Sequence, residues 1–437
     1  MNENLLLSDN LTILPCGHLA FAGYDTAELA AEYGTPLYLY DEARIRQNCR
    51  TYREALRQAF GERAAVFYAS KAASFKRIYE IIKEENIGID VVSAGEIRTA
   101  QRAGFPMERA VFHSNNKTDE DIRTAMDAGV GCFVADCEEE LYAVDREAAA
   151  RGMRQKVMLR LTPGIDPHTY AAVATGRVDS KFGFAVGTGQ AEHAASLALS
   201  LSGIELIGFH CHIGSQLFDS DVYLRSAKIM LDFLCLAKER FGFTAQMLDL
   251  GGGYGVRYVE KDPEIDIAAN IALVADFIKS YAEERGISLP VIAMEPGRSI
   301  VADAGITLYT VGSVKTIPGF LTYVSVDGGM TDNIRYALYG SLYTVLHAGR
   351  MQEARDMVCT LAGRCCESGD ILQSDISLPR STAREDLIAV LTTGAYHYSM
   401  ASNYNRIPRP PVVMLNEEGP YLAVRRETPD DLLSLDV

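Results

Sequence analysis

Eight short apolar runs alternate with helical stretches between residues 41 and 302, and this alternation predicts a (β/α)8 barrel of the TIM type. After residue 303 the strand-like runs are separated mainly by turns, which predicts a second, mostly antiparallel β domain. The amino-terminal segment has the same texture as that domain. We therefore expect a barrel over 41–302 and a β domain built from 1–40 and 303–437, with a doubly wound open sheet as the alternative to the barrel.

The barrel pattern opens with a helix over residues 41–60, whose apolar side chains share one stripe and whose first residue, Asp41, suits an N-cap. Helical stretches such as SFKRIYEIIKEE lie between most of the strands that follow. The predicted strands are VFYAS (66–70), IGIDVVS (87–93), VFHS (111–114), CFVAD (132–136), VMLRL (157–161), LIGFHCHIG (206–214), MLDLGGG (247–253) and VIAMEPG (291–297).

Composition excludes several classes of protein. The chain has 437 residues, of which 48% are hydrophobic and 23% charged, as in soluble globular proteins. A net charge of -16 without a basic tract argues against nucleic-acid partners. No run approaches the roughly 18 apolar residues of a membrane span. Nine cysteines without a regular framework, and an amino terminus without a signal peptide, predict a cytoplasmic protein.

Chemically active residues gather where the predicted strands end, the edge at which barrels of this class carry their active sites. Lys71 ends the first strand. Desolvation in an apolar rim would disfavour its ammonium form, and a neutral lysine amine is a nucleophile that can form a Schiff base. Taken alone, a lysine paired with a barrel carboxylate explains the residue equally well.

The seventh and eighth strands end in DLGGGYG and EPGR, in the loops that usually bind phosphate in these barrels. Three consecutive glycines offer backbone N–H groups to an anion, although Val256 breaks the dinucleotide fingerprint. A lysine and a phosphate nest together indicate pyridoxal phosphate, with Glu295 on the pyridine nitrogen and His212 against the ring. The alternative is zinc bound by His210 and His212, which share one face of a strand.

At this point the chain resembles the fold-type III pyridoxal-phosphate decarboxylases, and among them it is similar to the diaminopimelate decarboxylase family. The blocks that carry the resemblance run almost from end to end and are YGTPLYLYDEARIRQN, FYASKA, GIDVVSAGE, NNKT, SKFG, GFHCHIGSQ, DLGGGYG, EPGRSIVA, DGGMTDNIRYALYG, CCESGDIL and GAYHYSMASNYN.

The resemblance implies decarboxylation of meso-2,6-diaminopimelate to L-lysine and carbon dioxide, the last step of lysine biosynthesis, without a metal. It implies that Cys366 is the proton donor and reaches the active site of the other subunit of a homodimer. The implied cofactor contacts are Lys71, His212, Ser215, Gly252, Gly253, Glu295, Pro296, Gly297, Arg298 and Tyr396. The implied substrate contacts are Arg298, Arg335, Tyr339, Glu367 and Tyr396.

The residues also bear on the choice of substrate. Diaminopimelate carries a distal ammonium and carboxylate, for which Glu367 and Arg335 provide an acid and a guanidinium. Three positions depart from the family pattern, namely Tyr336 and the pair Arg364-Cys365. An ornithine- or arginine-type decarboxylase, an alanine-racemase-like enzyme and a non-catalytic pyridoxal-phosphate-binding protein are the alternatives.

Overall fold

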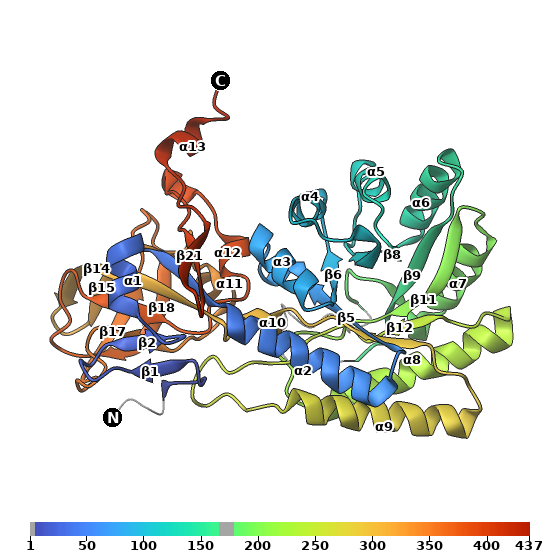
Figure 1. Cartoon of the computed structure of the whole chain (residues 1–437), viewed down its shortest axis with the longest axis horizontal. Coiled ribbons are helices and arrows are strands. Elements are labelled where there is room, and N and C mark those ends of the chain that lie inside the picture. Colours follow the sequence, from blue (N-terminus) through green and yellow to red (C-terminus); the bar gives the residue numbers. More distant parts are fainter. Residues whose placement is uncertain (1–4, 166–178) are drawn as a thin grey trace. The chain divides into compact units, whose positions relative to one another are not determined.

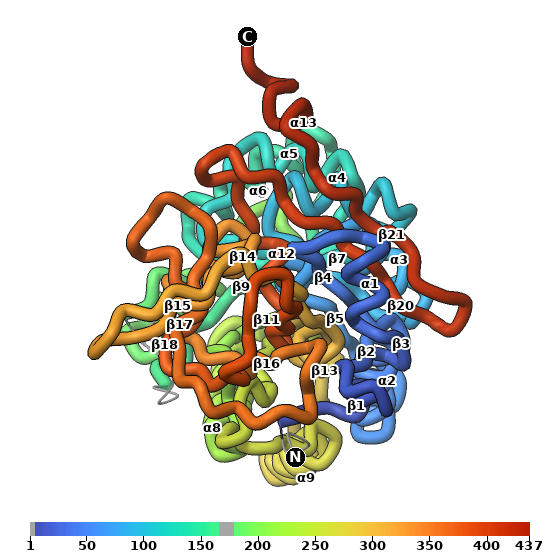
Figure 2. Tube along the Cα trace, turned by 90° about the vertical axis from the view of Figure 1, so that its left-hand side faces the viewer, coloured from blue at the N-terminus to red at the C-terminus, as the bar shows by residue number. Residues whose placement is uncertain are grey.

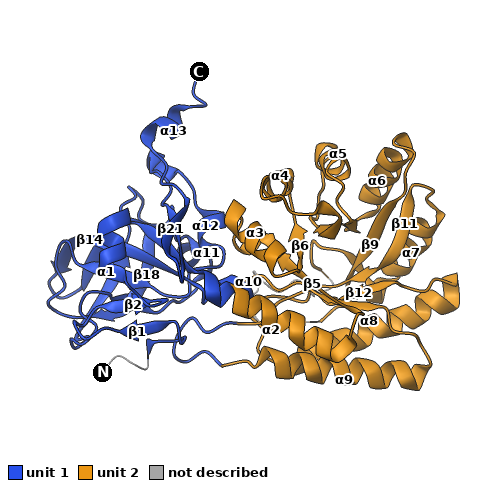
Figure 3. Cartoon of the chain, viewed as in Figure 1, with its two compact units in different colours: residues 1–45, 256–263, 300–437 blue, residues 46–255, 264–299 orange. Residues whose placement is uncertain are grey.

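The computed structural model describes residues 5–165 and 179–437, and the chain forms two compact units (Figures 1 and 3). Unit 1 consists of residues 1–45, 256–263 and 300–437, and unit 2 of residues 46–255 and 264–299. Residues 256–263 were expected in the barrel but belong to unit 1, because Tyr258 packs in its apolar cluster with Tyr309 and Val324.

Unit 2 is the predicted barrel. Within the described residues, eight parallel strands pair in sequence around a ring that the pairing of β8 with β9 closes, and β10 (Phe184–Ala185) adds to β9. Every apolar run named above forms one of these strands. They are β5 (Ala64–Ala69), β6 (Gly88–Val91), β7 (Ala110–Phe112), β8 (Cys132–Ala135), β9 (Gln155–Thr162), β11 (Ile204–His210), β12 (Met247–Asp249) and β13 (Val291–Met294).

Helices lie between these strands along the chain, and α8 and α9 lie side by side (Figure 1). Asp41 caps α2 as predicted, since its Oδ1 accepts the Arg44 N–H at 3.1 Å. None of the described helices is both long and apolar enough to cross a membrane. The helices are α2 (Glu42–Phe60), α3 (Lys76–Glu84), α4 (Ala94–Arg102), α5 (Asp119–Asp127), α6 (Glu138–Ala150), α7 (Gln190–Ser200), α8 (Ser220–Phe241), α9 (Ile267–Arg285) and the short α10 (Arg298–Val301).

Two kinds of side chain occupy the barrel strands. A buried apolar cluster includes Phe67 of β5, Val134 of β8 and Met158 of β9. Buried ionisable residues lie near or just beyond the carboxyl ends of several strands, and among these are Asp90, His113, Asp136, Arg160, His210, Asp249 and Glu295. Burying so many polar groups is costly unless they satisfy one another, which marks this end of the barrel as the candidate site.

Unit 1 is mostly antiparallel, as predicted; its described parallel pairs are β15 with β17 and β20 with β4. Figure 2 shows β15, β17 and β18 side by side. The strands are β1 (Leu11–Ile13), β2 (Leu19–Phe21), β3 (Tyr24–Asp25), β4 (Leu37–Asp41), β14 (Gly305–Ile317), β15 (Leu321–Val326), β16 (Val345–His347), β17 (Met357–Ala362), β18 (Ile371–Leu378), β19 (Leu387–Val390), β20 (Val412–Asn416) and β21 (Gly419–Val424). The helices are α1 (Thr26–Tyr33), α11 (Arg335–Tyr339), α12 (His397–Met400) and α13 (Pro429–Leu433).

Candidate active site

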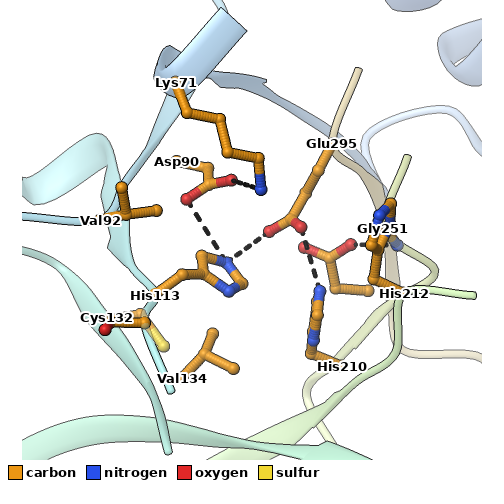
Figure 4. A network of polar contacts seen from close by, with 12 residues as sticks. Lys71, Asp90, Val92, His113, Cys132, Val134, His210, His212, Gly251 and Glu295 are labelled. Carbon is orange, nitrogen blue, oxygen red and sulfur yellow. Dashed lines mark hydrogen bonds and ion pairs between the residues drawn. The ribbon is translucent and has the colours of Figure 1, made fainter. Parts of the chain in front are cut away.

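Lys71 lies on a 3-10 turn, η2 (Ser70–Ala72), that follows β5 directly. Its side chain is 47% exposed, and its Nζ lies 3.9 Å from Oδ2 of the buried Asp90 (Figure 4). The expectation of a lysine sunk in an apolar rim is therefore wrong, because the turn carries the residue out of the strand at the barrel mouth. The pairing with a barrel carboxylate, which the sequence left open, is the arrangement found.

Glu295 follows β13 and lies between two buried histidines (Figure 4). His113 Nε2 is 2.6 Å from Glu295 Oε1, and His210 Nε2 is 3.0 Å from Oε2. Burial opposes ionisation of Glu295, but the two histidines outweigh it and hold the pKa of Glu295 well below its usual value. An anion is thereby fixed at the carboxyl end of the strands.

His212 is partly buried just beyond β11. Desolvation holds its pKa well below the usual value, and the nearby cations of Lys71 and Arg160 lower it further. The Gly252 N–H donates to its Nδ1 at 3.3 Å, so the proton of the neutral ring belongs on Nε2. The structure fixes the orientation of this imidazole, while its stacking on a cofactor stays a prediction.

Two backbone N–H groups of the glycine run after β12 donate hydrogen bonds to neighbouring side chains. The Gly251 N–H donates to Asp249 Oδ1 at 2.8 Å, and that of Gly252 donates to His212. Backbone packing requires these glycines, since a Cβ on Gly252 would lie 2.1 Å from the Glu295 carbonyl oxygen. Of the three amides predicted to bind an anion, that of Gly253 is therefore the one left for this role. Its φ of +114° also favours glycine.

A guanidinium–hydroxyl pair that would suit an anion lies beside this run. Buried Arg298 donates to Ser215 Oγ from Nε at 3.2 Å and from Nη2 at 2.9 Å. The hydroxyl hydrogen of Ser215 therefore points away from the guanidinium. An amine from Lys71, an ionised acid at Glu295 and this Ser–Arg pair share one end of one barrel, and they are the groups that pyridoxal phosphate needs.

Unit 1 holds a buried arginine of unusual setting. Arg335, on α11, is 6% exposed, and its guanidinium carbon lies 5.1 Å from the centre of the Tyr339 ring and 5.0 Å from that of Tyr396. Its Nε donates to Tyr343 Oη at 3.0 Å. No carboxylate of residues 5–165 or 179–437 forms an ion pair with Arg335, so a buried cation is left to an aromatic and hydroxyl environment.

The adjacent cysteines in the loop before β18 are clearly distinguished by burial. Cys365 is 9% exposed, and burial raises the pKa of its thiol to about 11. Cys366 is exposed and is held through its backbone N–H, which donates to Asn405 Oδ1 at 2.7 Å. Glu367 is also exposed, and the N–H of Gly369 donates to its side chain, which lowers its pKa. Cys366 is thus the accessible thiol of the pair.

Three site residues were not singled out from the sequence. All three lie inside runs predicted as strands; in the structure Asp90 is the last residue but one of β6, His113 follows β7 and Asp249 ends β12. An ionisable residue in such a run was the available signal. The sequence pairs His210 with His212 as possible zinc ligands, whereas in the structure the ring of His210 lies close to His113 and Glu295.

Comparisons with known proteins identify the relatives of this chain. Residues 42–302 match the family model described as "Pyridoxal-dependent decarboxylase, pyridoxal binding domain". The diaminopimelate decarboxylase of Bacillus subtilis is 46% identical over 96% of this chain and 95% of its own. That of Mycobacterium tuberculosis is 40% identical over 100% of both chains.

A solved structure extends the likeness to three dimensions. The diaminopimelate decarboxylase of M. jannaschii, crystallised with L-lysine, aligns with a TM-score of 0.91 and 33% identity over 98% of both chains. The alignment spans both the barrel and the second β domain. The chain belongs to the diaminopimelate decarboxylase family of pyridoxal-dependent decarboxylases.

Proposed function

We propose that this protein removes one carboxylate from meso-2,6-diaminopimelate, giving L-lysine and carbon dioxide, with pyridoxal phosphate as its cofactor. The family membership supports the reaction class. The observation that carries the choice of substrate is Arg335, a buried guanidinium without an acidic partner among the described residues.

A buried arginine of this kind favours a substrate with a second carboxylate. Leaving a guanidinium desolvated and unpaired is costly, and a bidentate carboxylate recovers that cost. Ornithine and arginine have cationic tails, which Arg335 would repel. Glu367, exposed in the same unit, is suited to the distal ammonium of diaminopimelate.

The remaining residues have separate roles in the proposal. Pyridoxal phosphate, when bound, supplies a sink for the electrons of the breaking bond. Lys71 would hold its aldehyde carbon, and Ser215 and Arg298 its phosphate. Glu295 would keep the proton on the pyridine nitrogen, because its carboxylate stays ionised. Cys366 would deliver a proton to the substrate Cα.

A homodimer with shared active sites completes the proposal. Cys366 belongs to unit 1 and Lys71 to unit 2, and the thiol is exposed. A donor on the surface of one unit is suited to serve a site in a second copy of the chain. The cytoplasmic location expected from the sequence remains a prediction, with which nine free cysteines are consistent.

The test is a substrate panel with the holoenzyme. Meso-diaminopimelate, ornithine, arginine and alanine are each followed for carbon dioxide release and for racemisation. Release from diaminopimelate alone, with L-lysine as product, supports the proposal. Preference for ornithine or arginine would reject the assignment of the distal site, and racemisation of alanine without carbon dioxide would reject the reaction.

A further inference from the structure

Asp249 occupies a central position among the buried polar residues of the barrel. It is 0% exposed and ends β12, where it pairs with His210 of β11 on one side and with Ala293 of β13 on the other. Glu295 comes two residues after Ala293, and its N–H continues the ladder by donating to the Gly251 carbonyl oxygen at 2.9 Å. Side chains two apart on a strand share a face, so the carboxyls of Asp249 and Glu295 point the same way.

The two oxygens of Asp249 have different surroundings. Oδ1 accepts the Gly251 N–H at 2.8 Å. Oδ2 is buried and has no hydrogen-bond donor among the described residues, although the side chain of Asp249 has the Glu295 carboxylate as its neighbour. Two buried carboxyls that are hydrogen-bonding neighbours are stable side by side only when they share a proton.

The distribution of donors decides which residue carries that proton. Glu295 receives hydrogen bonds from His113 and His210, whereas Asp249 receives one backbone N–H. Burial raises the pKa of Asp249 well above its usual value, and the charge of Glu295 raises it further. The more distant Asp90 acts in the same direction. A shared proton therefore belongs on Asp249.

We propose that Asp249 is a neutral carboxylic acid that donates a hydrogen bond from Oδ2 to Glu295, and that it is a positioning residue for the pyridine end of the cofactor. This inference rests on the proposed role of Glu295. The Glu295 carboxylate would then accept from His113, His210 and Asp249, and it would keep one of its roughly four lone-pair positions for the pyridine N–H. An ionised Asp249 would instead push Glu295 toward protonation and remove that acceptor.

The isosteric change Asp249→Asn tests the protonation state directly. The amide oxygen can keep the Gly251 N–H, and the amide nitrogen can donate to Glu295 in place of the acid. The infrared spectrum of the cofactor-free wild type should show the carbonyl stretch of a protonated acid. The Asp249→Asn variant should lack this band. The spectra are recorded at about pH 9, where Glu96 and Asp332 do not contribute a protonated-acid band. Both are ionised there, because burial raises the pKa of each only to about 7. An unchanged spectrum would overturn the proposal.

Cofactor affinity tests the positioning role. Asp249→Asn should bind pyridoxal phosphate with an affinity within about 3-fold of the wild type. Asp249→Ala should bind it at least ~10-fold more weakly, because removing a residue that orients a direct contact usually costs that much affinity. Equal affinity for all three proteins would overturn that role. If Glu295→Gln turns over normally, the proposed function of Glu295 fails, but the infrared result still decides the state of Asp249.

A matched control shows that the method distinguishes charged from neutral acids. Asp136, just after β8, is 6% exposed; its Oδ1 lies 3.9 Å from Arg160 Nε, and its Oδ2 accepts the Gly183 N–H. Asp136→Asn removes a charge that faces a cation, so it should lower the free energy of unfolding without removing a protonated-acid band. Asp249→Asn should remove the protonated-acid band and leave the free energy of unfolding nearly unchanged. A loss of stability as large as that of Asp136→Asn would contradict a neutral Asp249.

Discussion

Replacing Arg335 by methionine should separate substrate recognition from stability. Methionine keeps much of the length of the side chain between Tyr339 and Tyr396 and can contact both rings through its sulfur. It removes the positive charge and the donors that we propose for the distal carboxylate. The expected result is a large loss of activity on diaminopimelate in a protein that folds as well as the wild type.

The structure sets the size of both effects. Two charge-assisted hydrogen bonds at the lower end of their range contribute about 3 to 4 kcal/mol, so kcat/KM should fall by ~100- to 1,000-fold. For folding, the change loses about 1 kcal/mol with the Tyr343 hydrogen bond and about 1 to 2 kcal/mol with the two aromatic contacts. Releasing a buried, unpaired charge returns several kcal/mol. The free energy of unfolding should therefore stay level or rise.

Arg44 offers a matched control in the same unit. Its Nε and Nη2 contact Asp303 Oδ2 at 2.8 and 2.7 Å, so it is an arginine with an acidic partner. Arg44→Met should lower stability and leave kcat/KM unchanged. The assays are denaturant unfolding, and carbon dioxide release from diaminopimelate and from a substrate without a distal carboxylate. If Arg335→Met unfolds like Arg44→Met, or loses activity equally on both substrates, Arg335 is structural.

Four further outcomes are expected. Lys71→Ala should retain no covalently attached cofactor after borohydride reduction, and attachment at another lysine would refute its assignment. Glu295→Gln should still bind the cofactor but turn over at least ~100-fold more slowly, and a near wild-type rate would mean that the pyridine nitrogen has another partner. Burial raises the pKa of Glu96 from 4.5 to about 7, so between these pH values the folded state binds more protons than the unfolded state, and the free energy of unfolding should fall by up to about 3 kcal/mol as pH rises from 4.5 to 7. Denaturant unfolding measured against pH should lose this slope in Glu96→Gln, in which the Val92 N–H keeps its acceptor. Mixed Lys71→Ala and Cys366→Ala subunits should recover roughly a quarter of wild-type activity after exchange, and no recovery would place both residues in one chain's site.

The barrel was predictable because each strand is a short apolar run that ends at a polar or glycine-rich turn, as in VFYAS followed by Lys71. The exposure of Lys71 was not predictable, because the direction of a side chain beyond a strand end depends on the turn that follows it. The assignment of residues 256–263 failed for a similar reason. They follow a barrel strand in sequence, yet Tyr258 packs with apolar residues from beyond residue 300.

The buried acids show why a sequence alone cannot assign protonation. Asp249 and Glu295 are both acids after apolar strands, and nothing in their local sequence separates them. Their states differ because His113 and His210 converge on Glu295 from two other strands, while Asp249 has a backbone amide. One negative charge that accepts hydrogen bonds from two histidines costs less inside a barrel than two facing charges. The arriving pyridinium would then neutralise that single charge, so the site gains most of its electrostatic balance only when the cofactor is present.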